Sequence, residues 1–63
     1  MNYNVIFITE NNEQVDRWRN TRLEPMIGSL LMDTKYNSYK VLDKKYEAIN
    51  MHTINVTAIV ERV

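Results

Sequence analysis

Ten residues near the C-terminus alternate between apolar and polar side chains more regularly than any other part of the chain. Between Thr53 and Arg62, one set is Ile54, Val56, Ala58 and Val60, and the other is Asn55, Thr57, Ile59 and Glu61. Successive side chains of a strand point to opposite faces, so this pattern is typical of a half-buried antiparallel strand. The alternation therefore favours a β-sheet protein.

The chain is short and contains no cysteine. Its 63 residues are enough for one domain, so we expect a single small β-barrel domain over 1–63. A domain of this size buries only about 60% of the surface that its unfolded chain exposes. No disulfide or thiolate metal site is available, and the single histidine, His52, cannot build a zinc site alone. We therefore expect no metal and no cofactor, and stability that comes from packing, assisted by a partner or a second copy.

Turn-forming residues divide the chain into five strand-like segments. Gly28 and Pro25 are the only glycine and proline, and they mark a break over Leu23 to Gly28. The predicted strands are Tyr3 to Glu10, Glu13 to Asn20, Ser29 to Asp33, Tyr39 to Ala48 and Thr53 to Arg62. In the fourth of these, Tyr39 and Val41 are expected on one face, and Leu42 and Tyr46 on the other.

The first two strands are predicted to form a hairpin around a two-residue loop, Asn11-Asn12. Glu10 then pairs with Glu13, Ile8 with Val15, and Val5 with Trp18. This register places Trp18 on the face of Tyr3, Val5 and Phe7, and Val15 on the opposite face with Ile6 and Ile8.

A helix over Glu13 to Leu23 is the alternative for the second segment. Asn11 or Asn12 would cap it, and its acidic residues precede its basic ones, as the helix dipole prefers. We favour the strand because the apolar stripe, Val15 and Trp18, is too thin to bury a helix.

Five short strands with close turns predict an all-β fold, a small five-stranded antiparallel barrel or meander. The hairpin, the break Pro25-Met26-Ile27-Gly28, the strand containing Tyr39-Lys40-Val41 and the alternating last strand resemble small phage and prophage proteins with a Src-homology-3-like barrel. The resemblance covers nearly the whole chain. It departs from the pattern in a long loop before Tyr39 and in Asn12, where glycine is more usual. It implies a non-enzymatic accessory protein that binds another protein, such as a host factor that it inhibits, and it carries over no functional residue.

The charges of the chain balance. Eight basic and eight acidic residues give a formal net charge of zero, which argues against a dominant nucleic-acid footprint and removes a barrier to self-association. No apolar run reaches the roughly 20 residues that span a membrane, and the N-terminus lacks the features of a signal peptide. We therefore expect a cytoplasmic protein, in the host cytoplasm if it is phage-encoded.

One face of the predicted hairpin is the first candidate site. If Tyr3, Val5, Phe7 and Trp18 form the core, the opposite face presents aliphatic side chains rimmed by arginines, which is the ordinary composition of a protein interface. The predicted partner-binding residues are Ile6, Ile8, Val15, Arg17 and Arg19. The partner is a different protein or a second copy of the chain.

The alternative is a nucleic-acid-binding barrel. Arg17, Arg19 and Arg22 would contact phosphates, and the tyrosines at 36, 39 and 46 would stack on bases. Against it, the acidic residues among the neighbouring lysines cancel most of the charge, and Trp18 is the one large aromatic that so small a core needs.

No catalytic residues are predicted. A nucleophile needs a base that is held by an orienting group, and nothing places Ser29 or Ser38 beside His52. The carboxylates are scattered without metal-ligand spacing, and a chain with one glycine has no glycine-rich phosphate loop. The sequence therefore predicts a protein that is not an enzyme.

Overall fold

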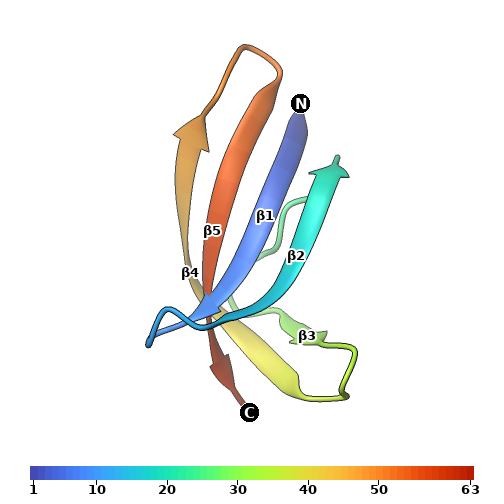
Figure 1. The fold of residues 1–63 in the computed structure, drawn as a ribbon, viewed down its shortest axis with the longest axis vertical. Coiled ribbons are helices and arrows are strands. Elements are labelled where there is room, and N and C mark those ends of the chain that lie inside the picture. Colours follow the sequence, from blue (N-terminus) through green and yellow to red (C-terminus); the bar gives the residue numbers. More distant parts are fainter.

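The computed structural model describes residues 1–63 as five strands without a helix. The strands are β1 (Asn2–Thr9), β2 (Gln14–Thr21), β3 (Leu30–Met32), β4 (Ser38–Ala48) and β5 (Thr53–Arg62). They form one curled sheet in the order β2-β1-β5-β4-β3, which has the shape of half a barrel (Figure 1). The all-β expectation is confirmed, and the second segment is a strand rather than a helix.

The expectation of a purely antiparallel barrel or meander is wrong. The first and last strands, β1 and β5, pair in parallel, from Asn2 beside Thr53 to Thr9 beside Val60. The other three pairs are antiparallel. A parallel pair needs a long connection instead of a tight turn, and here β2 to β4 supply it. The alternation along β5 identified a strand, but it carried no information on whether β1 would pair with it in parallel or antiparallel.

The core lies on one face of the sheet, which we call the inner face. It consists of seven buried apolar residues: Val5, Phe7, Tyr39, Val41, Val56, Ala58 and Val60. Trp18 packs against this cluster, and its ring meets Phe7 edge-on, with centroids 4.8 Å apart and an interplanar angle of 66°. The expected core role of Trp18 and the expected faces of β5 are confirmed.

The predicted pairing of Val5 with Trp18 is present in the hairpin of β1 and β2, but the turn differs from the predicted two-residue loop. The turn has three loop residues, Glu10 to Asn12: the Asn12 N–H donates to the Thr9 carbonyl at 2.9 Å, and the Thr9 N–H donates to the Glu13 carbonyl at 2.9 Å. Asn12 has a φ of 63°, the left-handed conformation for which asparagine often replaces glycine. The predicted Glu10–Glu13 pair is therefore wrong.

A β-bulge between Phe7 and Ile8 then restores the register. Ile8 pairs with Gln14 rather than with Val15, and Val5 pairs with Trp18. Val15 packs against the core and not with Ile6 and Ile8, so its predicted face is wrong. Val15 and Trp18 are three residues apart and would face opposite sides of a regular strand, but the extra residue of the bulge lets both reach the core.

A second bulge, between Val41 and Asp43, corrects the faces predicted for β4. Tyr39 and Val41 are buried as expected. Beyond the bulge, Tyr46 pairs with Val56 and therefore lies on the inner face rather than with Leu42. The bulge again adds one residue and inverts the alternation that follows.

Residues 22–29, which we call the strap, cross the inner face behind the sheet in Figure 1. Pro25 is buried, and the Ser29 N–H donates to the Met26 carbonyl at 3.1 Å. Gly28 has a φ of 88° at the third position of this turn, the position at which a type II turn needs a residue with positive φ. The predicted break over Leu23 to Gly28 is thus a connection with defined turns that covers the inner face of the sheet.

Candidate functional site

The face opposite the core, which we call the outer face, is hollowed into an open groove of about 620 Å³. Four strands contribute two outward side chains each: Asn4 and Ile6 from β1, Arg17 and Arg19 from β2, Lys45 and Glu47 from β4, and Asn55 and Thr57 from β5. The groove thus crosses the sheet from the free edge strand β2 to β4.

Burial places the groove on the outer face. Val5 and Val56 also border it, with exposed fractions of 0% and 1%, as do their pairing partners Trp18 and Tyr46. Side chains so fully buried point into the core, so these two valines border the groove with their backbones. The strap covers the inner face, and nothing lies in front of the upper parts of β1 and β5 in Figure 1. The outer face is therefore the face of the sheet that the chain itself leaves open.

The groove has an excess of positive charge within a neutral chain. It contains three cations, Arg17, Arg19 and Lys45, and one anion, Glu47. The structure has a single salt bridge, which joins Lys44 and Glu24, so none of the three groove cations is paired. Two of them lie on β2, which places most of the positive charge along one side of the groove. An anionic group would find unpaired cations there.

Amide side chains order the floor of the groove. Asn4 donates to the Asn55 side-chain oxygen at 3.4 Å and accepts a hydrogen bond from the Asn20 N–H at 2.9 Å. The second contact closes a bulge of β2 between the Tyr3 and Val5 pairs, where Asn20 has a φ of 50°. The floor and the arginine side are therefore tied to each other.

Apolar side chains continue the outer face beyond the groove. Ile8 is half-buried and lies beside Ile59 of β5, and Ile6 lies beside Thr57. Neither Ile6 nor Ile8 packs against the core cluster. Ile6, Ile8 and Ile59 therefore form an aliphatic patch, with Arg17 directly beside Ile6.

The structure brings together four of the five predicted partner-binding residues. Ile6, Arg17 and Arg19 border the groove, and Ile8 adjoins it on the same face. Val15 lies on the other side, where it borders a smaller hollow of about 180 Å³ with Tyr39. Sequence reasoning missed Lys45 and Ile59. The alternation of β5 already placed Ile59 among its outward residues, but its proximity to Ile8 depends on the parallel pairing.

The residues named for nucleic-acid binding are dispersed. Arg22 is exposed beyond the end of β2 and does not border the groove. Tyr39 is buried in the core, Tyr46 is on the inner face, and Tyr36 is exposed in the turn between β3 and β4. Tyr46 borders the groove, but its pairing with Val56 places its side chain on the inner face.

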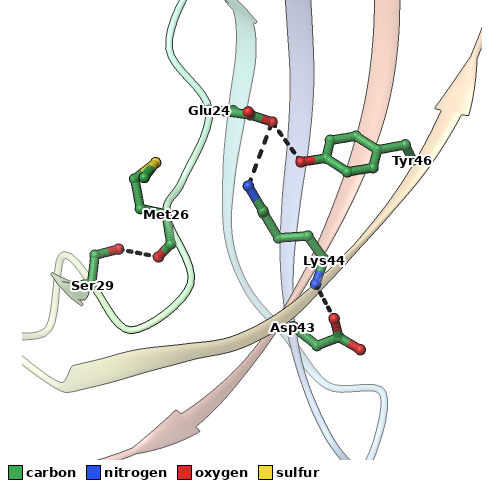
Figure 2. Close-up of polar contacts among 6 residues, drawn as sticks. All are labelled: Glu24, Met26, Ser29, Asp43, Lys44 and Tyr46. Atoms are coloured by element: carbon green, nitrogen blue, oxygen red, sulfur yellow. Dashed lines mark hydrogen bonds and ion pairs between the residues drawn. The ribbon is translucent and has the colours of Figure 1, made fainter.

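A polar cluster fastens the strap to β4 (Figure 2). The Tyr46 hydroxyl donates to Glu24 Oε2 at 2.8 Å, and Lys44 Nζ lies 3.6 Å from the same oxygen. Lys44 Nζ is also 5.5 Å from the centre of the Tyr46 ring, and its side chain is only 11% exposed. Its contact with Tyr46, together with the Glu24 charge, raises the pKa of Lys44. The cluster is structural, because it holds the segment that covers the core.

The residues considered for catalysis are separated. His52 is exposed in the turn between β4 and β5, whereas Ser29 is in the strap and Ser38 begins β4. No group of three or more histidine, aspartate or glutamate side chains comes close enough to hold a metal ion. No helix has the length and apolarity to cross a membrane.

A comparison of the chain with protein-family models, curated proteins and solved structures found no match. The fold and the geometry of the outer face are therefore the basis for the functional argument.

Proposed function

We propose that this chain is a small, non-enzymatic accessory protein of the phage type that works by binding another protein, and that the outer face is its contact surface. Inhibition of a host factor in the cytoplasm is the role that fits the proposal. The half-barrel is then a variant of the Src-homology-3-like barrel, with the first and last strands side by side in parallel.

The observation that carries the proposal is the composition of the uncovered face. An aliphatic patch of Ile6, Ile8 and Ile59 adjoins a groove with three unpaired cations. Apolar centres with arginine at the margin are the usual composition of protein interfaces. Covering each aliphatic side chain contributes at most ~1.5–3 kcal/mol, from which the entropy of association must be subtracted. The aliphatic patch therefore supplies only part of the binding free energy, and larger side chains of the partner supply the rest.

Nucleic-acid binding is the competing proposal, and Arg17 and Arg19 are the observation that favours it. It lacks a stacking platform, because Tyr36 lies outside the groove, Tyr39 is buried in the core, and Tyr46 borders the groove only from the inner face. Salt separates the two, since counterion release makes nucleic-acid binding fall steeply with ionic strength, whereas burial of an aliphatic patch does not depend on it in that way.

The test uses single glutamate substitutions in the aliphatic patch and at a control position outside the groove. Ile6→Glu and Ile8→Glu, made singly, should keep the fold, as circular dichroism and thermal melting would show. Both should lose the partner that the wild-type chain captures from a bacterial lysate, or lose self-association in sedimentation equilibrium. Leu30→Glu is the matched control, because Leu30 is an exposed aliphatic residue that borders no groove. Capture that survives both isoleucine changes would refute the proposal.

A further inference from the structure

We propose that the groove binds an extended peptide segment that carries acidic side chains at alternate positions. This inference rests on the proposed function, because it names the chemistry of the partner at the same face. The carboxylates of the peptide would meet Arg17 and Arg19, and its backbone would lie over the polar floor.

The spacing of the two arginines determines the spacing of the carboxylates along the peptide. Arg17 and Arg19 are two residues apart on β2 and border the same groove. A strand rises about 3.3 Å per residue, so their Cα atoms are separated by roughly 6.6 Å. In an extended peptide, carboxylates at every second residue have the same separation and lie on one side. Such a peptide can therefore give each guanidinium its own carboxylate. An arginine and a carboxylate can form two parallel hydrogen bonds, which is a favourable geometry for arginine.

The floor matches a peptide backbone. Asn4, Asn55 and Thr57 present amide and hydroxyl groups between the arginine side and the lysine side. Such side chains donate and accept hydrogen bonds, as an extended backbone requires. Neighbouring strands are about 4.8 Å apart, so the four strands span roughly 14 Å, which accommodates one extended chain.

The opposite side of the groove limits the ligand to one acidic row. Lys45 and Glu47 are two residues apart on β4, so an anion near Lys45 also approaches the Glu47 carboxylate. A uniformly charged polyanion would meet this repulsion along its length, whereas a peptide with one acidic side and one neutral side would not. Trp18 and Tyr46 border the groove, but they pair with the buried Val5 and Val56 and so lie on the inner face. They offer no outward surface for bases to stack on, so the observations favour a peptide over a nucleic acid.

The experiment measures fluorescence polarisation with three labelled probes. The first is a nonapeptide of alternating threonine and glutamate, the second has the same composition with its glutamates in one block, and the third is a thymidine oligonucleotide of similar length. The alternating peptide should bind at low salt, several-fold more tightly than the block peptide. Arg17→Ser and Arg19→Ser should each weaken its binding by about tenfold, which corresponds to roughly 1.4 kcal/mol.

Arg22→Ser is the matched control, because Arg22 is exposed in the same region but lies outside the groove. It should bind the alternating peptide as the wild-type chain does. Equal binding of the two peptides, equal losses in all three arginine variants, or tighter binding of the oligonucleotide would overturn the inference. If no peptide binds while Ile6→Glu still abolishes partner capture, the inference fails and the proposed function stands. If the peptide binds but capture survives Ile6→Glu and Ile8→Glu, the proposed function fails.

Discussion

Val5 and Val56 lie side by side at the centre of the parallel pair, and both are almost completely buried. Their strands come from opposite ends of the chain, so the core forms only when residues 51 positions apart meet. The same pairing places Ile6 beside Thr57 on the outer face. Core and candidate site are thus two sides of one strand pair.

This pairing predicts opposite outcomes for adjacent residues of β5. Val56→Asp should unfold the domain, because burying an unpaired carboxylate costs several kcal/mol, on the order of the whole stability of a small domain. Thr57→Asp should fold, because Thr57 is half-buried at the open groove, where it pairs with Lys45. Thermal melting followed by circular dichroism measures both, and equal melting temperatures would contradict the faces assigned to β5.

The turn between β1 and β2 predicts a position-specific effect of a β-branched residue. Asn12 has a positive φ and Asn11 does not. Asn12→Val should lower stability by about 1–2 kcal/mol, because the left-handed conformation is costly for such residues. Asn12→Gly should be neutral or stabilising, and Asn11→Val is the control that should change stability less. Denaturant titration provides the free energies, and equal losses for both valine variants would refute the turn.

The strap predicts a modest role for one hydroxyl. Tyr46→Phe removes the hydrogen bond to Glu24 and should cost about 0.5–1.5 kcal/mol. For a domain of this size that lowers the melting temperature by roughly 4–8 °C per kcal/mol. Tyr36→Phe is the control, because the Tyr36 side chain is exposed and forms no hydrogen bond in the structure. A Tyr46→Phe variant that melts like the control would show that the cluster does not hold the strap.

The Asp33 carboxylate in the turn before β4 is predicted to contribute to stability in a way that depends on pH in the acid range. Desolvation acts to raise the pKa of Asp33, but hydrogen bonds from the Asn37 and Lys35 N–H groups outweigh it and hold the pKa below its usual 3.8. A carboxyl whose pKa is lowered by folding stabilises the protein above its usual pKa, and this contribution is lost as the pH falls through the folded value. Between about pH 5 and pH 2.5, the wild-type melting temperature should therefore fall more than that of Asp33→Asn. Parallel curves would contradict the role of Asp33.

Local pattern predicted which segments are strands, because alternation and turn residues act over a few positions. The break at Pro25 and Gly28, the core role of Trp18 and both faces of β5 follow from such signals. The faces of Val15 and Tyr46 did not, because each lies beyond or within a bulge, and one extra residue inverts the alternation. A bulge is chosen by tertiary packing, which a single strand does not reveal.

The candidate site was predictable only in its first half. Ile6, Ile8, Arg17 and Arg19 share one hairpin, so the pairing of neighbouring strands brings them together. Lys45, Thr57 and Ile59 join them through the parallel contact of β1 with β5, which depends on the closure of the whole chain. Long-range pairing of this kind carries no local sequence signal.

Site-specific photo-crosslinking shows whether the outer face is the binding surface. p-Benzoylphenylalanine in place of Ile8 would sit on the outer face, and in place of Leu30 it would sit at the exposed edge strand β3. After irradiation in a bacterial lysate, the chain modified at Ile8 should form a discrete adduct with a partner protein or a second copy. The chain modified at Leu30 should form no such adduct. Adducts from Leu30 alone, with none from Ile8, would show that the outer face is not the binding surface.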